Sequence, residues 1–207
     1  MPDNSLEISS WAAGHLLLTF DETGYGCIAG SMFVAGVTFQ HNFNFSLLSG
    51  LNDSKKMSEK SRFAMESLIL QHCLWSCCRE VTAAEIDAGS PYHMRFSIAQ
   101  DIAREFNMLG AANVIMDGNV SLNLPQAHSS TCLVKGDSKC LSIAAASVLA
   151  KCAKDRQMIA LSDESPVYGW ASNKGYESQS HGDAILKFGL SRHHRKSYCK
   201  KYLGAKC

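Results

Sequence analysis

The stretch His15–Gly30, HLLLTFDETGYGCIAG, places the strongest constraint on how this chain can fold. Its apolar run Leu16–Phe20 is typical of a buried strand, yet two adjacent acids, Asp21 and Glu22, follow directly. Carboxylates at the edge of a core lose hydration and persist there when they are paired or metal-bound. Because neighbouring strand residues point to opposite faces, both acids reach one ion only at a bend or a strand end. The stretch indicates either a metal site or a surface hairpin with solvated acids.

A glycine-flanked turn, Gly24-Tyr25-Gly26, comes immediately after the acids. Glycine allows a sharp turn and lets a ligand approach the backbone closely. We therefore expect any metal site here to face a ligand that touches this turn.

The composition limits the class of protein. With 207 residues, 46% hydrophobic and 19% charged, the chain suits one globular domain with a real core. Its apolar runs are shorter than the roughly 18 residues of a membrane helix, so no membrane partner is expected. The polar start MPDNSLEISS lacks a signal pattern, and the nine cysteines are expected to be reduced thiols in a cytoplasmic setting. We expect a loose segment over 1–13 and a single domain over 14–207.

Charge is distributed unevenly along the chain. The net charge is only +1, but Lys187–Cys207 holds 7 of the 20 Lys and Arg residues and none of the acids. This pattern indicates either a basic C-terminal segment that contacts a polyanion or a solvated basic tail.

Hydrophobic periodicity predicts an α/β fold with a mixed central sheet flanked by helices. Helices are expected from the N-cap Ser58 to about Cys78, over 95–109, over 141–160 and over 183–188. Strands are expected over 16–20, 30–39, 81–86 and 112–116.

Acids recur where predicted strands end. Asp117 follows an apolar strand, and Asp137 lies between Leu133-Val134 and a helix. Sites in α/β sheets gather at strand ends, and four oxygen ligands favour Mg²⁺ or Mn²⁺ over zinc. Lysines lie nearby in the sequence, at 55, 56, 135 and 139. Acids that hold metal beside lysines that hold phosphate indicate phosphodiester hydrolysis.

Eight motifs resemble those of the ribonuclease HII family, type 2 ribonuclease H, in order and spacing. The match spans residues 14–198. The motifs are DETGYG at 21–26, LNDSKKMSEK at 51–60, EID at 85–87, MDGN at 116–119, VKGDSK at 134–139, IAAASVLAKCAKDR at 143–156, NKGY at 173–176 and HHRKSY at 193–198.

The resemblance implies a ribonuclease H-like fold and an endonuclease that cleaves the RNA strand of RNA/DNA hybrids. It also implies cleavage at single ribonucleotides in duplex DNA, leaving a 5′-phosphate and a 3′-hydroxyl. By the same resemblance, Asp21, Glu22, Asp117 and Asp137 hold two ions about 3.5–4 Å apart, with Asp21 as the bridge. The substrate contacts that it implies are Gly24, Tyr25, Gly26, Ser54, Lys55, Lys56, Lys139, Tyr176 and Arg195.

Tyr176 matches a family tyrosine that stacks near the ribonucleotide–deoxyribonucleotide junction, although a core-edge aromatic is the alternative. The turn departs from the family, which has Gly-Arg-Gly or Gly-Lys-Gly where this chain has Gly24-Tyr25-Gly26. Two alternatives follow, a hybrid-only ribonuclease H with impaired junction recognition and a non-cleaving hybrid-binding module. A further alternative is a related nuclease on the same fold, such as a junction resolvase, against which the LNDSKK and VKGDSK motifs speak.

Several other polar residues carry smaller expectations. Asp155 is interpreted as a structural ion pair and Asp53 as a loop-organising acid, while His193 and His194 are assigned to a phosphate-side basic cluster. His181 is expected at the surface, and the group His72, Cys73, Cys77 and Cys78 on a half-buried helix. No clamp-binding motif is recognised in Tyr202–Cys207, and a monomer is expected.

Overall fold

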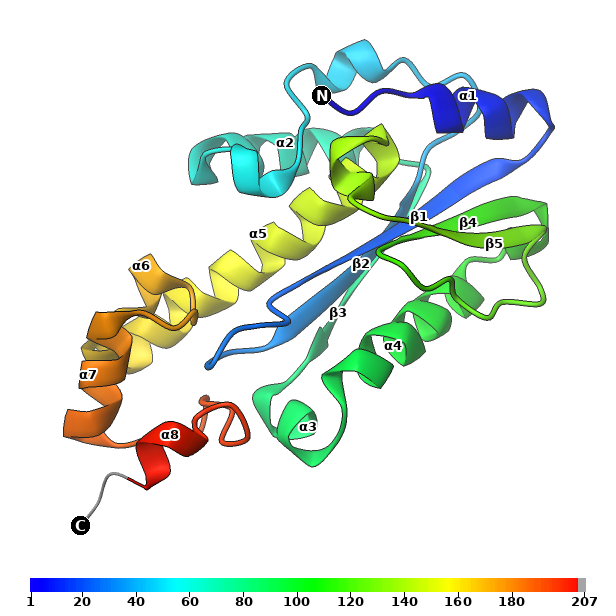
Figure 1. The fold of residues 1–207 in the computed structure, drawn as a ribbon. Helices are drawn as coiled ribbons and strands as arrows, with labels where there is room; N and C mark the ends of the chain where they lie inside the picture. The colour runs from blue at the N-terminus through cyan, green and yellow to red at the C-terminus, as the bar shows by residue number, and fades with distance from the viewer. Residues whose placement is uncertain (205–207) are drawn as a thin grey trace.

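The computed structural model describes residues 1–204 and contains a mixed sheet with strand order β3-β2-β1-β4-β5 (Figure 1). β1 pairs antiparallel with β2 and parallel with β4, while β3 joins β2 antiparallel and β5 joins β4 parallel. The predicted mixed central sheet is therefore confirmed. The strands are β1 (Leu16–Thr23), β2 (Met32–Thr38), β3 (Trp75–Val81), β4 (Ala112–Asp117) and β5 (Ser129–Leu133).

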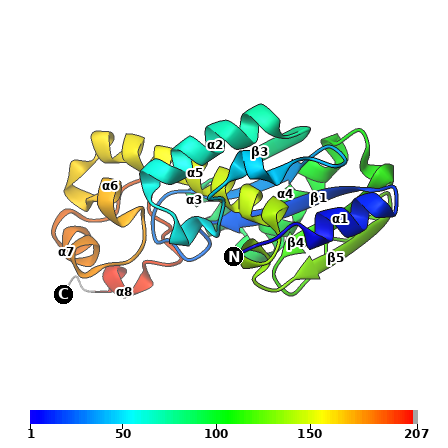
Figure 2. The same cartoon turned by 90° about the horizontal axis from the view of Figure 1, so that it is seen from above.

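Helices cover both faces of the sheet. α5 and α2 lie on one face and α4 on the other, while α6, α7 and α8 gather beyond one end (Figures 1 and 2). Over the described residues, no helix combines the length and the apolarity needed to cross a membrane. The helices are α1 (Ser5–Ala12), α2 (Glu59–His72), α3 (Ala83–Ala88), α4 (Pro91–Glu105), α5 (Leu141–Glu164), α6 (Trp170–Asn173), α7 (Gln179–Phe188) and α8 (Lys200–Leu203).

The central helix α5 confirms the helix predicted over 141–160. Its alanines at 144, 145 and 146 are fully buried, and small side chains let a helix approach a sheet closely. Residues of α5 and β2 share one apolar core, whereas Leu18, Phe20 and Val114 pack with α4 in a second core on the opposite face. Leu17 of β1 packs with Ile143 of α5 in a smaller cluster, so β1 is buried on both sides, which explains its continuous apolar run.

The N-terminal segment is ordered, so the expected loose segment over 1–13 is wrong. Ser5–Ala12 forms α1, and Glu7 is completely buried. The Glu7 carboxylate accepts a hydrogen bond of 2.7 Å from the Ser142 backbone N–H, where α5 begins. Trp11 packs into the core shared by β2 and α5. Tertiary contacts therefore hold a segment whose polar composition indicated mobility.

The helix predicted from Ser58 to Cys78 is too long. Ser58 does cap α2, but the helix ends at His72 and the chain continues as strand β3. β3 pairs along its whole length with β2, and this pairing outweighs the helical spacing of the apolar residues. The strand expected over 81–86 is also wrong, because Thr82 and Glu85 form a capping box that starts α3.

Candidate functional site

Strand β1 carries both acids of the first motif, and it continues past them to Thr23. Asp21 pairs with Ala35 and Glu22 with Val34, so both acids lie in regular strand, and only Thr23 follows them before β1 ends. Of the two expected placements, a bend and a strand end, the structure has the strand end. Phe20 belongs to the core beneath α4, so strand alternation places Glu22 on the α4 face and Asp21 on the α5 face. Strand alternation therefore points the two side chains to different faces, yet both lie near Asp117, whose negative charge raises the pKa of each.

Asp21 is almost fully buried, with 4% of its surface exposed. Its Oδ1 accepts a hydrogen bond of 2.8 Å from the Glu22 backbone N–H. Burial raises the pKa of Asp21 well above its ordinary range, and the negative charges of Glu22 and Asp117 raise it further. A carboxylate in such surroundings needs a cation to remain ionised.

Asp117 ends β4, the strand beside β1, and Asp137 lies in the short turn η4 (Gly136–Ser138). Asp117 Oδ1 accepts a hydrogen bond of 2.6 Å from the Gly136 N–H. A Cβ on Gly136 would stand 2.6 Å from Ile143 Cδ1 and 3.2 Å from Asp117 Oδ1, so glycine relieves crowding where the turn meets Asp117. The Lys55 ammonium lies 3.5 Å from Asp137 Oδ2. The structure thus joins the 51–60 loop to the acids.

Glu22 has a partner that sequence reasoning did not identify. Arg95 of α4 donates a hydrogen bond of 2.8 Å from Nη1 to Glu22 Oε1. Burial raises the pKa of Glu22, although the Arg95 charge opposes the shift. Glu22 Oε2 is buried and has no hydrogen-bond partner. The only sequence signal for Arg95 was its place at the start of a predicted helix.

The donor set fits a hard divalent cation. All four acids offer oxygen ligands, three of them have pKa values raised chiefly by burial, and Glu22 Oε2 is an unpaired buried acceptor. No group of three or more His, Cys, Asp or Glu side chains in residues 1–204 is gathered closely enough to enclose an ion. Over these residues the four acids thus offer oxygen ligands without forming a closed cage.

The turn after β1 is held from beneath. Gly24 has φ +86°, and a Cβ there would lie 2.8 Å from the Ser31 carbonyl oxygen and 2.9 Å from Lys154 Cε. Gly26 has open space where a Cβ would lie, and Tyr25 is 41% exposed. The turn thus presents one open glycine and one aromatic ring to solvent.

Two residues expected to contact substrate are buried supports. Arg195 is fully buried and donates to the backbone oxygens of Tyr25 and Gly30, each at 2.9 Å, so it holds the turn from behind. Ser54 is 3% exposed, and its Oγ lies 2.8 Å from Ser147 Oγ on α5. Both expectations of direct contact are corrected, because neither side chain reaches the surface.

The remaining expected contacts are accessible. Lys55, Lys56 and Lys139 are exposed, and Tyr176 is 41% exposed. The Lys154 ammonium lies 4.8 Å from the centre of the Tyr176 ring. It also donates a hydrogen bond to the Lys174 carbonyl, so Lys154 links the Tyr176 loop to α5.

The loop that carries Lys55 is anchored by buried charge. Arg62 donates to the Ser54 and Met57 carbonyls and pairs with Asp155 at 2.7 Å. Asp155 also pairs with Lys151 at 2.6 Å and is fully buried, so its prediction as a structural ion pair is confirmed. Asp53 accepts a hydrogen bond from the Lys55 backbone N–H, as expected of a loop-organising acid.

The predictions for His181 and His194 are wrong, because both side chains are buried. His181 is fully buried and His194 is 2% exposed, so the first is not a surface residue and the second is not part of an accessible basic cluster. Burial lowers the pKa of His194 to about 4. Both residues support the C-terminal helices.

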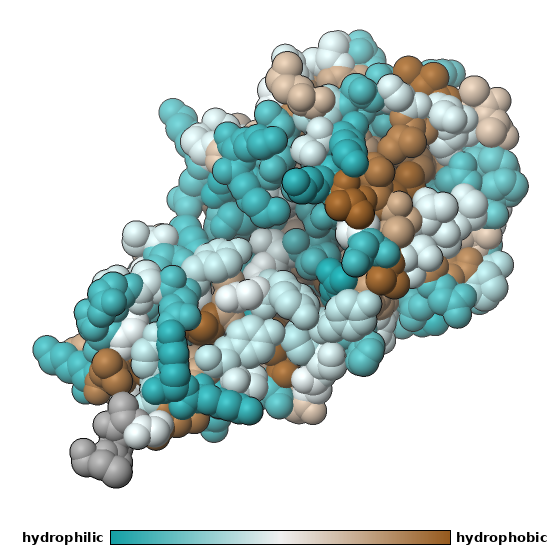
Figure 3. Space-filling view, in the orientation of Figure 1, coloured by the Kyte–Doolittle hydropathy of each residue, from teal (hydrophilic) through white to brown (hydrophobic). Residues whose placement is uncertain are grey.

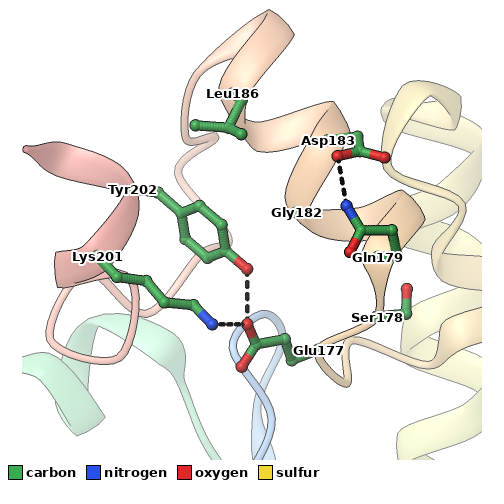
Figure 4. A pocket seen from close by; sticks show the side chains of 8 residues that line it. All are labelled: Glu177, Ser178, Gln179, Gly182, Asp183, Leu186, Lys201 and Tyr202. Atoms are coloured by element: carbon green, nitrogen blue, oxygen red, sulfur yellow. Dashed lines mark hydrogen bonds and ion pairs between the residues drawn. The ribbon is translucent and has the colours of Figure 1, made fainter. Parts of the chain in front are cut away.

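The surface has hollows at some distance from the four acids, so the location of the candidate site has to be argued from the acids themselves. In Figure 3 the middle of the face, between the C-terminal helices and the sheet, is hollowed and mainly hydrophilic or neutral. A separate open hollow of about 530 Å³ lies between α7 and α8 (Figure 4). Its Glu177 is already paired with Lys201 and Tyr202, and Asp183 accepts from Gln179. None of the four acids lines that hollow. We therefore place the candidate site at the carboxyl ends of the neighbouring strands β1 and β4.

The family model and the most similar relatives name the same family. The family model described as Ribonuclease HII matches residues 18–202. A ribonuclease HII from Helicobacter acinonychis (strain Sheeba) is 39% identical over 189 residues, which cover 90% of this chain and 97% of the relative.

Solved structures share the fold at lower sequence identity. Ribonuclease H2 from Pyrococcus horikoshii OT3 has a TM-score of 0.72 at 19% identity, with 90% of this chain and 96% of that chain covered. Bst-RNase HIII in complex with Mn²⁺ has a TM-score of 0.73 at 18% identity, with 92% and 70% covered. The predicted ribonuclease H-like fold is confirmed.

Proposed function

This chain belongs to the ribonuclease HII family. We propose that it cleaves its substrate at the carboxyl ends of β1 and β4, where Asp21, Glu22, Asp117 and Asp137 lie. It is a metal-dependent endonuclease that acts on the RNA strand of RNA/DNA hybrids. The finer proposal is that it also cuts at single ribonucleotides in duplex DNA and leaves a 5′-phosphate and a 3′-hydroxyl.

One observation carries this placement. Asp21 and Asp117 come from adjacent parallel strands, and the η4 turn that holds Asp117 also brings Asp137 to Lys55. Acids for a cation and a lysine for a phosphate therefore occupy one edge of the sheet. Such a combination suits a phosphodiester held between metal and protein.

The cofactor that we propose is Mg²⁺ or Mn²⁺, two ions during turnover, held by Asp21, Glu22, Asp117 and Asp137. A structural neighbour, Bst-RNase HIII, is described in complex with Mn²⁺, which supports a divalent cation. When bound, such ions activate a water and stabilise the charge on the leaving oxygen. The protein's own contribution is to hold four carboxylates at an open edge where substrate phosphate completes the site.

The Gly24–Gly26 turn and Tyr176 are the proposed junction-reading elements. Gly26 leaves open space at the turn, so a sugar can approach the backbone, and Tyr176 offers an accessible ring for stacking. Buried Arg195 and Lys154 hold these two elements in place. Lys55, Lys56 and Lys139 supply cations for the backbone phosphates.

The test is a gel assay with two labelled duplexes, one a full RNA/DNA hybrid and one with a single ribonucleotide in DNA, in Mg²⁺ and in Mn²⁺. We expect cleavage of both, with a cut on the 5′ side of the lone ribonucleotide. Asp21→Asn should abolish cleavage while duplex binding persists.

Each alternative has its own outcome in that assay. Cleavage of the hybrid alone indicates a hybrid-only enzyme, and absence of cleavage with retained binding indicates a non-cleaving hybrid-binding module. Cleavage by Asp21→Asn at the wild-type rate contradicts the proposed metal site.

The proposed partners are the RNA/DNA hybrid and ribonucleotide-containing duplex DNA, with the protein acting as a monomer. The absence of a clamp-binding motif remains a sequence prediction, since 205–207 lie outside the described residues. A reducing compartment is proposed because the cysteines described by the structure are free thiols.

A further inference from the structure

We propose that Arg95 is a positioning residue for hydrolysis, which holds Glu22 by one carboxylate oxygen and is itself held by the Tyr25 ring. This inference rests on the proposed function, because it concerns how Glu22 is presented to a cation. It assigns a role to Tyr25, the residue by which this turn departs from its family.

The contact between Arg95 and Glu22 is asymmetric. Arg95 Nη1 donates to Glu22 Oε1 at 2.8 Å, whereas Oε2 is buried and has no hydrogen-bond partner. Because Arg95 binds only Oε1, it fixes the rotamer of the Glu22 carboxylate and leaves Oε2 available to a further ligand. Outer partners of this kind orient metal ligands and are commonly worth a factor of about 10–100 in metal affinity or activity.

Arg95 is fixed by aromatic rings from two elements. Its guanidinium carbon lies 5.8 Å from the ring centre of Tyr25, 5.1 Å from that of Tyr92 and 4.6 Å from that of Phe96. Tyr92 and Phe96 belong to α4, but Tyr25 belongs to the turn after β1. Cation–π contacts therefore connect the turn that faces substrate to the helix that holds Glu22.

The burial of Arg95 favours positioning over phosphate binding. Its side chain is 13% exposed and Glu22's is 15% exposed, whereas Lys55, a proposed phosphate contact, is 74% exposed. An arginine enclosed by rings and paired with a carboxylate has little surface left for a polyanion. A basic residue in place of Tyr25 would set a second cation beside Arg95, so an aromatic ring is the compatible neighbour.

The experiment compares Arg95→Gln and Arg95→Lys with a control on the same helix, Arg104→Gln. Arg104 is exposed and pairs with Asp101, so its removal tests the loss of one positive charge on α4. Each variant is titrated with Mn²⁺ by calorimetry without substrate, and kcat and KM are measured on the single-ribonucleotide duplex. Thermal unfolding shows that each variant is folded.

We expect Arg95→Gln to weaken Mn²⁺ binding and to lower kcat, each by about tenfold or more, with KM changed by less than about threefold. Arg95→Lys should recover part of both losses, and Arg104→Gln should match the wild type. Tyr25→Ala should shift both quantities in the same direction by a smaller factor, and it serves as the second test if Arg95→Gln does not fold.

Two outcomes overturn the inference. One is unchanged Mn²⁺ affinity and kcat in a folded Arg95→Gln protein. The other is a rise in KM with unchanged kcat and a salt dependence of duplex binding reduced by about one unit, which would make Arg95 a phosphate contact. If the wild type cleaves neither duplex, the proposed function fails, but the calorimetric comparison still decides whether Arg95 positions Glu22.

Discussion

The Nε2 atoms of His181 and His194 lie 3.1 Å apart in the interior, and their other contacts settle which nitrogen of each ring carries the proton. His181 Nδ1 lies 2.9 Å from the Tyr176 carbonyl, so it must donate, and its Nε2 accepts from Trp170 Nε1. His194 Nδ1 accepts from the Ser191 N–H, which leaves Nε2 as its donor to His181. Both rings are therefore neutral, and a further proton on either would face an N–H donor.

This pair predicts a loss of stability in mild acid. Burial lowers the pKa of His181 below its ordinary value of 6.5 and lowers that of His194 to about 4. Between about pH 6.5 and about pH 4, these two histidines bind more protons in the unfolded chain than in the folded one. The free energy of unfolding should therefore fall as the pH drops through this range. Urea unfolding followed by circular dichroism across this range measures the slope.

Replacing His194 by Gln should flatten that slope, whereas the exposed His41→Gln should retain it. An equally steep slope in His194→Gln would assign the acid sensitivity to other groups.

Loss of the buried acid Asp155 should be costly. Asp155→Ala leaves Arg62 buried without its charge partner, and breaking such a pair typically costs about 3–5 kcal/mol. Because Arg62 also holds the Ser54 and Met57 carbonyls, duplex binding through Lys55 should weaken as well. Chemical denaturation and duplex titration measure the two effects. Asp163→Ala, at an exposed position on the same helix, should stay within about 0.5 kcal/mol of the wild type.

Alanine substitutions at the two glycines of the turn should change different properties, the stability of the fold for Gly24 and the recognition of substrate for Gly26. Gly24→Ala forces a Cβ against the Ser31 carbonyl at a positive φ, and we expect a loss of about 1–3 kcal/mol of stability. Gly26→Ala meets open space and should unfold like the wild type, yet it should impair cleavage at a lone ribonucleotide because its methyl group occupies the approach to the backbone. Wild-type cleavage by Gly26→Ala would exclude backbone reading at this position.

Lys55 should act on substrate through its charge. Its side chain is 74% exposed and lies 3.5 Å from Asp137, so Lys55→Met should leave stability nearly unchanged. We expect weaker duplex binding and a plot of log Kd against log salt whose slope falls by about one unit, as for the loss of one phosphate contact. An unchanged slope would show that Lys55 serves Asp137 and not the nucleic acid.

The sequence by itself determined the α/β class, the central buried strand with Asp21 and Glu22 and the long helix α5, and it predicted the four acids as one set. These features depend on local pattern: apolar runs, alanine-rich helical spacing, and acids where strands end. The eight motifs identified the family for the same reason, since they are short segments in a defined order.

Only the tertiary structure decided which segments pair and which charged side chains are buried or exposed. Residues 75–81 form a strand that pairs with β2, although their apolar spacing predicted a helix. The buried Glu7 carboxylate holds α1 in place by accepting a hydrogen bond from the start of α5. The tertiary structure also enclosed Arg195 and His181, and it set Arg95 against Glu22 across 73 positions of sequence. Burial and long-range contact sum over the whole fold, so no local pattern specifies which charged side chain reaches solvent and which one supports its neighbour.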